Sequence, residues 1–304
     1  MVLRVRGGKK LIDVYKDEDK KKASEKNYLS LNIPPPRKDD SLGDFPDRMS
    51  CSRIQSFMKC PFYFKLQYLD GFKVADDSEH LSRGKELHDM FYYASMTGMP
   101  EVIRSFDGYN KYPDHCENFI EMAKIIQRKA GYKLPLMAET EIYDPEDKVL
   151  LYLDRIDLVG KQLDVVELLD YKTGAPKRNI WEYKFQLALY TYYVEKILKL
   201  KVKRWGVMFT GENGDLIYEP VDRAKVDMIP EMIRMVREGI SDCHVDGFDK
   251  RRNNLCYHCK FRAFSLCDGA VHQKRAKHAH GLLEIYRYDW SRGLNGGEPM
   301  STTP

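Results

Sequence analysis

The sequence has no apolar run that approaches the roughly 18 residues of a membrane-spanning helix. Its opening residues, MVLRVRGGKK, lack the apolar core of a secretory signal. Positive charge is only slightly in excess, with 50 Lys and Arg against 46 Asp and Glu, so a bulk polycation that holds nucleic acid through net charge is excluded. We therefore expect a protein without membrane contact in the cytoplasm, or in the host cytoplasm if it is phage-encoded.

Disulfide bonds are a further expected absence. Seven cysteines in a chain without an export signal indicate reduced thiols or metal ligands. With 304 residues, 43% hydrophobic and 32% charged, the chain can form one large or two modest globular domains.

Composition divides the chain into four parts. Residues 1–48 carry a charge run and three consecutive prolines, which predicts a charged, partly flexible arm. Residues 49–242 hold the patterned core, beginning with helices. Residues 243–292 form a cysteine-rich segment with a basic tail, and residues 293–304 are expected to be disordered.

A predicted β-hairpin carries the first group of chemically informative residues. Two strand-like runs flank the turn at Gly160–Gln162, and the second run ends in Asp170 and Lys172. Side chains alternate along a strand, so this acid and this lysine share a face with the apolar Val166 and Leu168. Burying two charges is costly unless a metal ion or a phosphate compensates, which indicates a functional site, with an ordinary Asp–Lys pair on a surface hairpin as the alternative.

A second carboxylate should come from the first strand of this hairpin. The expected turn places residues 152–153 opposite Asp170, next to Asp154. Asp154 and Asp157 have opposite parity, so only one of them can face the site. We prefer Asp154, with Asp157 as the fallback because a bulge could shift the register. Two acids could bind a divalent metal ion through their oxygen atoms, and the lysine could stabilise a water molecule or a phosphate beside it.

Residues on the neighbouring predicted elements could complete this site. His88 lies on the apolar stripe of a helix expected over 79–98, where a hydrogen-bonded core histidine is the alternative to a ligand. Glu139 and Glu141 share a face of the strand expected from Met137 to Tyr143, as solvated polar residues or as accessory metal ligands. Downstream, Gln186 and Tyr190 are four residues apart, so they occupy one face of a helix.

Taken in order, these motifs resemble the RecB-like branch of the PD-(D/E)XK nuclease superfamily. The matching stretches are Ser52–Leu69 around Cys60–Phe62, the Gly-x-x-x-His motif ending at His88, Leu153–Asp157, Asp170–Gly174, and Gln186–Tyr190. Leu151 departs from the pattern, since many relatives have glycine there. The resemblance implies an α/β fold, a restriction-endonuclease-like mixed sheet core flanked by helices, with a helical N-terminal part and a cysteine-rich C-terminal clasp.

The resemblance also implies an activity, the metal-dependent hydrolysis of DNA phosphodiester bonds by an exonuclease on single-stranded ends, in recombination, repair or replication. Lys172 would position the attacking water and stabilise the developing charge, while Gln186 and Tyr190 would orient the lysine and the strand. The groups that would hold Mg²⁺ or Mn²⁺ are His88, Asp154, Asp170 and the backbone carbonyl of Tyr171. A helicase, a recombinase or a single-strand-binding protein is the expected partner.

The C-terminal cysteines form a second constellation. Cys256 and Cys259 are spaced as Cys-x-x-Cys, a strong metal signal, and Cys267 follows. From the residues alone the fourth ligand stays open among Cys60, Cys243, Cys51, His258 and His272. Iron-sulfur members of the RecB-like branch, of the AddB and CRISPR-adaptation types, use one cysteine before the core and three after it. That split implies a [4Fe-4S] cluster on Cys60, Cys256, Cys259 and Cys267, with zinc as the alternative.

Two other classes of function compete with a nuclease. The first is a non-catalytic DNA-binding scaffold subunit of a recombination complex. The second is a zinc-stabilised interaction protein in which Asp170 and Lys172 form a structural ion pair. The complete set of acids, lysine and glutamine favours the enzyme, because a dead relative has no reason to keep a costly buried charge group.

Overall fold

A computed structural model describes residues 4–5, 48–69, 79–131, 134–160, 162–174 and 183–251, together with residues 256, 259, 261 and 267. The chain forms two compact units. The first contains residues 1–50, 75–178 and 189–222, and the second contains residues 51–74, 179–188 and 223–304. Most of the arm, the basic tail and residues 293–304 lie outside the described residues.

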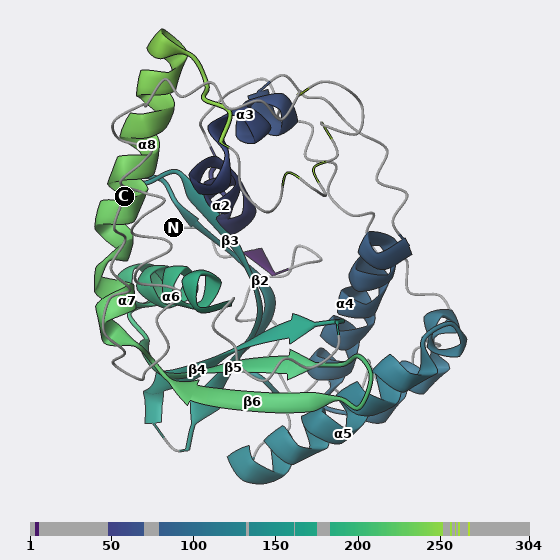
Figure 1. Ribbon diagram of the computed structural model, residues 1–304. Coiled ribbons are helices and arrows are strands. Elements are labelled where there is room, and N and C mark those ends of the chain that lie inside the picture. Colours follow the sequence, from purple (N-terminus) through teal and green to yellow (C-terminus); the bar gives the residue numbers. More distant parts are fainter. Residues whose placement is uncertain are drawn as a thin grey trace, which may run out of the picture. The chain divides into compact units, whose positions relative to one another are not determined.

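The first unit is built on a six-stranded mixed sheet in the order β1-β2-β3-β4-β5-β6 (Figure 1). Only β4 and β5 pair in parallel, and every other neighbouring pair is antiparallel. The mixed sheet flanked by helices that the sequence predicted is therefore confirmed. Its strands are β1 (Arg4–Val5), β2 (Met137–Asp144), β3 (Val149–Val159), β4 (Gln162–Lys172), β5 (Lys201–Phe209) and β6 (Asp215–Pro220).

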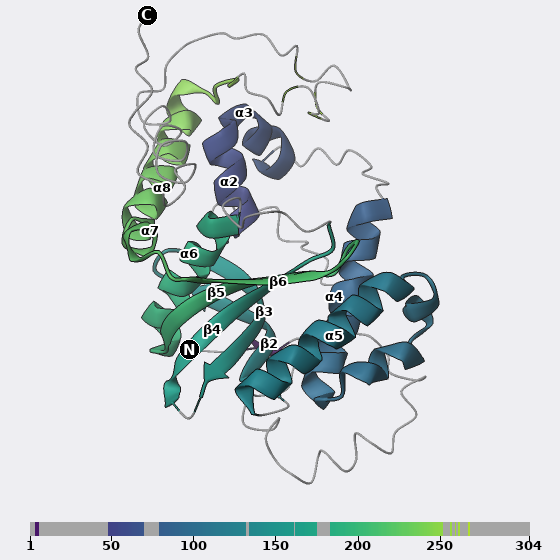
Figure 2. The same ribbon diagram turned by 60° about the horizontal axis from the view of Figure 1, so that its bottom comes forward.

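Helices α4 (Glu79–Thr97) and α5 (Pro113–Ala130) pack on one face of this sheet (Figures 1 and 2). Between them run the short 3₁₀ helices η4 (Pro100–Ser105) and η5 (Asp107–Asn110). The apolar stripes of both long helices meet Leu169 and Tyr171 of β4 in a common core. Phe91 and Phe119 stack with ring centroids 4.3 Å apart, and each ring meets the Tyr171 ring edge-on. Tyr171 is thereby fixed from both helices.

The opposite face of the sheet carries the alternate side chains of β4 and β5. Trp205 of β5 is fully buried there, and its indole nitrogen donates a 2.8 Å hydrogen bond to Thr191 of α6 (Lys184–Tyr193). A π-helical turn, η7 (Val194–Leu198), continues α6 and ends at Lys199, whose φ is 59°. The helix predicted around Gln186 and Tyr190 is thus present, with a change of winding in its last turn.

The β3–β4 hairpin corrects the predicted register. Arg155 pairs with Leu169, which places Asp154 level with Asp170, where residues 152–153 were expected. The cause is a bulge between Leu158 and Val159, which a two-strand pattern in sequence does not reveal. The bulge moves Asp154 closer to Asp170 and does not favour Asp157.

The second unit contains helices from both ends of the chain. Its elements are α2 (Cys51–Lys59), α3 (Pro61–Phe64), the π-helical η3 (Lys65–Leu69), α7 (Arg223–Asp227) and α8 (Ile229–Asp246). Helix α8 carries Pro230 in its first turn and ends at Asp246. Gly239 lets α8 approach α2, because a Cβ at this position would lie only 3.2 Å from the Phe57 ring. Among the described residues, no helix is long and apolar enough to cross a membrane.

Candidate active site

The candidate site lies where β3 and β4 separate. Arg155 and Leu169 form the last pair of this ladder, and Asp154 and Asp170 are the next residues on the two strands. Beyond the separation, the backbone N–H of Tyr171 donates a 2.5 Å hydrogen bond to Oδ2 of Asp154. A carboxylate therefore takes the place of a backbone partner from β3, which fixes the Asp154 side chain at the end of β4.

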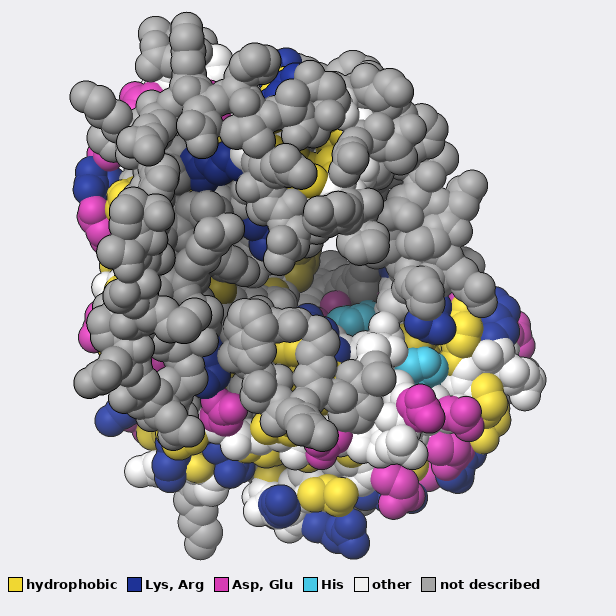
Figure 3. Space-filling view, in the orientation of Figure 1, with side chains coloured by type: hydrophobic (Ala, Val, Ile, Leu, Met, Phe, Trp, Pro, Cys, Tyr) yellow, Lys and Arg dark blue, Asp and Glu magenta, His cyan; other side chains and the backbone are white. Residues whose placement is uncertain are grey.

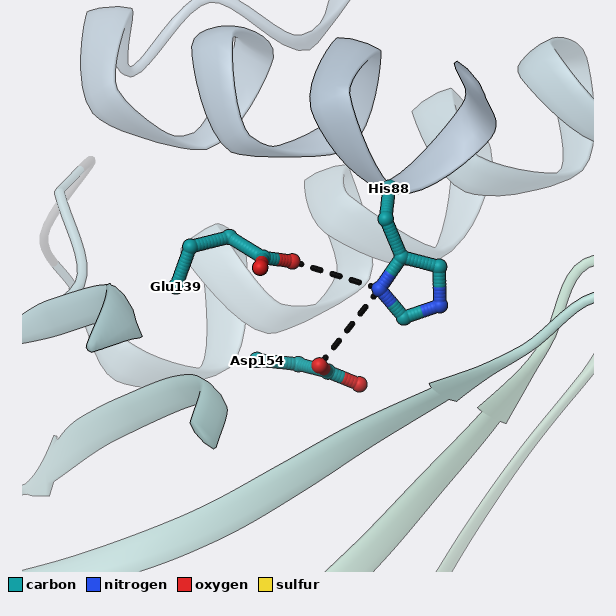
Figure 4. Close-up of side chains that lie close together, drawn as sticks. All are labelled: His88, Glu139 and Asp154. Carbon is teal, nitrogen blue, oxygen red and sulfur yellow. Dashed lines mark hydrogen bonds and ion pairs between the residues drawn. The ribbon is translucent and has the colours of Figure 1, made fainter. Parts of the chain in front are cut away.

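His88 on α4 joins two carboxylates at this point (Figure 4). Its Nδ1 lies 3.2 Å from Oε1 of Glu139 and 3.4 Å from Oδ1 of Asp154. One ligand atom from each of the three residues lies within 4.8 Å of the other two, a spacing that a single metal ion could bridge. The His88 side chain is 25% exposed. Histidine side chains also reach the surface in the view of Figure 3, beside acidic and basic groups.

Glu139 reaches this cluster through an unusual backbone conformation. Its neighbours Ala138 and Thr140 pair with Arg155 and Leu153, so Glu139 is level with Asp154 across the β2–β3 ladder. Its φ is 43°, in the left-handed region that a non-glycine residue adopts at a cost of about 1–3 kcal/mol. The strand thus contains a strained residue at the position where a carboxylate meets His88.

Asp170 and Lys172 form the second part of the site. The Lys172 ammonium lies 2.6 Å from Oδ2 of Asp170, whose side chain is 3% exposed, whereas that of Lys172 is 25% exposed. The predicted pair is therefore close in space and opens toward solvent on the lysine side.

Burial and charge shift the pKa values of these groups in opposite directions. Burial and the charge of Asp154 raise the pKa of Asp170 to about 6, although Lys172 opposes this shift. Burial would lower the pKa of His88, but the charges and hydrogen bonds of Asp154 and Glu139 outweigh it and raise that pKa well above its usual range. Burial would raise the pKa of Asp154, but His88, Lys172 and the Tyr171 N–H lower it. Without metal, a protonated His88 therefore sits between the two carboxylates.

A buried polar network contacts the hydroxyl of Tyr171. Arg155 and Asp157 form a bidentate ion pair with distances of 2.6 and 2.9 Å, and their side chains are 2% and 0% exposed. The Ser95 hydroxyl lies 3.3 Å from both the Arg155 guanidinium and the Tyr171 hydroxyl. Asp157 is thus paired with a cation inside the protein, on the face opposite Asp154.

The sequence was also compared with known proteins. Residues 48–142 and 148–267 match the PD-(D/E)XK nuclease superfamily. The chain belongs to this superfamily. The match spans both strands that carry Asp154 and Asp170, as well as the helix that carries His88.

The solved structures that resemble this chain have low sequence identity to it. A "Putative exonuclease" from Eubacterium rectale has 14% identity and a TM-score of 0.47, with 74% of this chain and 94% of that chain covered. A protein named SSO0001 has 13% identity and a TM-score of 0.33, with coverages of 73% and 86%. A search of curated proteins returns no match. The superfamily assignment therefore relies on the sequence match.

The structure brings together most of the predicted catalytic residues of this superfamily member. His88, Asp154, Asp170, Tyr171 and Lys172 surround the end of the β3–β4 ladder. Tyr190 is buried on α6 within the same unit, whereas Gln186, one helical turn earlier, belongs to the second unit.

Glu139 is the residue that sequence reasoning undervalued. Its alternation with Glu141 signalled a possible accessory role, but nothing local distinguished the two acids. Only the contact with a helix 51 residues earlier in the chain makes Glu139 part of the cluster.

The predicted cysteine ligands lie in the second unit. Cys60 begins α3, where its sulfur accepts a hydrogen bond from the Tyr63 N–H. The backbone N–H of Arg251 donates a hydrogen bond to the Cys60 sulfur, and the Arg251 carbonyl accepts one from Cys256 at 3.7 Å. Burial raises the pKa of the Cys60 thiol, and nearby Cys267 adds to this shift. Cysteines that are far apart in the sequence are thus neighbours, and Cys259 follows Cys256 on a tight turn.

Proposed function

We propose that the chain is a RecB-like, metal-dependent deoxyribonuclease that acts as an exonuclease on single-stranded DNA ends. One observation carries this proposal, namely the junction of the His88–Glu139–Asp154 cluster with the Asp170–Lys172 pair in a member of a nuclease superfamily. Such an arrangement would let a bound metal ion and the Lys172 ammonium contact the same phosphate.

The residues present fit a divalent cation. Two carboxylates and an imidazole lie within 4.8 Å of one another, and Asp170 adds a third acid at the next position of β4. Carboxylates, carbonyls and water suit Mg²⁺ and Mn²⁺, and imidazole is a common ligand of transition metals. The ligands in this proposal are His88, Asp154, Asp170 and the Tyr171 carbonyl, with Glu139 as a further acid.

Each residue has a separate task in hydrolysis. The bound metal would polarise the phosphate and lower the pKa of a water molecule. Hydrolysis joins the water oxygen to phosphorus, breaks the ester P–O bond and passes a proton to the leaving oxygen. Lys172 turns from Asp170 toward the phosphate, where its ammonium positions the water and stabilises the charge that develops. The Tyr171 N–H keeps Asp154 oriented toward the metal.

The α6 residues take supporting roles in this proposal. Gln186 and Tyr190 lie one helical turn apart, so they present hydrogen-bonding groups along one line of the helix. They would orient Lys172 and the DNA strand.

For the cysteines we propose a structural [4Fe-4S] cluster held by Cys60, Cys256, Cys259 and Cys267, with zinc as the alternative. The support is the backbone of Arg251, which contacts Cys60 through its N–H and Cys256 through its carbonyl, and the closeness of Cys267 to Cys60. Thiolate ligands suit either metal. A clip that closes a loop of roughly 200 residues would stabilise the second unit strongly.

A nuclease assay tests the proposed activity. The purified protein should degrade single-stranded DNA with Mg²⁺ or Mn²⁺ and lose this activity with a chelator. Lys172→Ala should abolish degradation and leave the thermal unfolding transition in place, because the Lys172 side chain is partly exposed. Undiminished degradation by Lys172→Ala would refute the assignment.

A further inference from the structure

Two tyrosines are exposed beside the candidate site. Among the described residues, the exposed large hydrophobic side chains are Met99, Tyr143, Tyr152 and Leu163. The two aromatic members of this set, Tyr143 at 37% and Tyr152 at 48% exposure, both lie on the β2–β3 hairpin. Exposed aromatic rings grouped on one element are candidates for ligand contact.

Both tyrosines lie on the same face of the β2–β3 hairpin as Glu139 and Asp154 of the candidate site. Burial alternates along β3, where Tyr152 and Asp154 are accessible and Leu151 and Leu153 are buried. It alternates likewise along β2, where Glu139, Glu141 and Tyr143 are the accessible residues. Tyr152 pairs with Glu141, which makes Tyr143 its diagonal neighbour on the same face.

The strand geometry sets the spacing along this face. Tyr152 is two residues from Asp154, a separation of about 6.8 Å along a strand. Tyr143 is about 7–8 Å from Tyr152 on the diagonal. In space, Asp154, Tyr152 and Tyr143 therefore form a line that leads away from the site in steps of similar length.

We propose that Tyr152 and Tyr143 form a base-stacking subsite for the unpaired nucleotides next to the phosphate that is cleaved. This inference rests on the proposed nuclease function and deepens it, because it identifies the residues that would select single-stranded DNA. Bases in a strand are about 3.4 Å apart, so an aromatic ring inserted between two of them doubles the step to about 6.8 Å, which matches the spacing of the line. A duplex cannot offer its base faces in this way.

Charge on the same face favours bases over phosphates. Glu141 is half-buried directly opposite Tyr152, outside the His88–Glu139–Asp154 cluster. Its carboxylate would repel a phosphate backbone placed against the hairpin, whereas the flat faces of bases carry no net charge. The strand would thus bind with its bases toward the tyrosines and its backbone toward solvent, without preference for a particular base.

Binding measured in the Lys172→Ala background tests the subsite without cleavage. Fluorescence anisotropy with a labelled oligonucleotide should show that Tyr152→Ala and Tyr143→Ala each weaken single-strand binding about 10-fold, the usual loss of one base–aromatic stack. Duplex binding should change less than about 2-fold, since paired bases do not stack on these rings. Tyr152→Phe should bind as the parent does, because the ring remains.

Two controls isolate stacking from folding. Leu163→Ala alters a more exposed apolar side chain, 79% accessible, on the neighbouring strand β4, and should leave binding unchanged. An oligonucleotide with an abasic position near its end should bind the parent as weakly as it binds Tyr152→Ala, with no further loss in the combination. Equal affinity of Tyr152→Ala and its parent for single strands would overturn the subsite, as would an equal loss with the duplex. The nuclease proposal fails separately, if the wild-type protein with Mn²⁺ cleaves no DNA.

Discussion

Glu139 and Asp154 face each other across the β2–β3 ladder, and both carboxylates reach the same nitrogen of His88. Glu139 adopts a left-handed backbone conformation at this position. A strained non-glycine residue persists only where its surroundings enforce it, and such residues concentrate at functional sites. This relationship leads to the first prediction.

Glu139→Gln should weaken Mn²⁺ binding by about 10- to 100-fold, the range typical of lost groups around a metal. The amide keeps the shape of the side chain but removes the charge that faces His88. Isothermal titration calorimetry measures the change directly. Glu141→Gln is the matched control, since it removes an acid two residues away on the same strand. Equal losses in both variants would point to a general charge effect and contradict a specific role for Glu139.

The two acids of β3 should differ in what they support. Asp157→Asn breaks the buried pair with Arg155 and should lower the free energy of unfolding by about 3–5 kcal/mol. Asp154→Asn should leave stability nearly unchanged and remove metal-dependent cleavage. Urea denaturation and the nuclease assay, applied to both variants, separate these roles. A stable Asp157→Asn protein that has lost its activity would reverse the assignment of the two acids.

The metal-free protein should lose stability as the pH rises from 5 to 8. The fold raises the pKa of Asp170 from 3.8 to about 6 and raises that of His88 as well, so the native state holds these protons more tightly than the unfolded chain. That contribution is fully present below the unfolded pKa of each group and is lost as the pH passes the folded pKa. Asp154 has a lowered pKa, and its opposite contribution is complete above 3.8.

Added Mn²⁺ should reverse this loss, because metal binding requires the unprotonated ligands. At 100 times the dissociation constant, the melting temperature should rise by about 5–10 °C at pH 8. The rise should be much smaller at pH 5. Differential scanning fluorimetry across this pH range tests the prediction, and Asp170→Asn should flatten the pH dependence of the metal-free protein. A metal-induced shift that is independent of pH would argue against binding at this cluster.

The cysteine proposal predicts a coloured protein after anaerobic purification. Cys256→Ala should lose its visible absorbance and its bound iron, lower the thermal stability and weaken DNA binding. Cys51→Ala is the control, because Cys51 is half-buried in α2 and was the alternative ligand nearest in sequence to Cys60. Bound zinc with no visible absorbance would instead support the zinc alternative. Unchanged metal content and stability in Cys256→Ala would contradict both.

Local spacing was sufficient to identify much of this protein. Alternation along a strand placed Asp170 beside Lys172, and helical periodicity turned His88 inward. Helix α5 is capped by Gly131, where φ is 74°, a conformation that glycine adopts without strain. These features depend on residues a few positions apart, so the spacing of residues in the sequence predicts them.

Other features required the tertiary structure. The bulge after Leu158 sets which residue lies level with Asp170, and it depends on how β3 pairs with β4 over their whole length. The turn residues alone gave a register that was wrong by one or two positions. Glu139 joins the cluster because its backbone turns left-handed opposite Asp154 while α4 brings His88 to the same point. Contacts between elements distant in sequence decide such geometry, since no local preference favours a positive φ for glutamate.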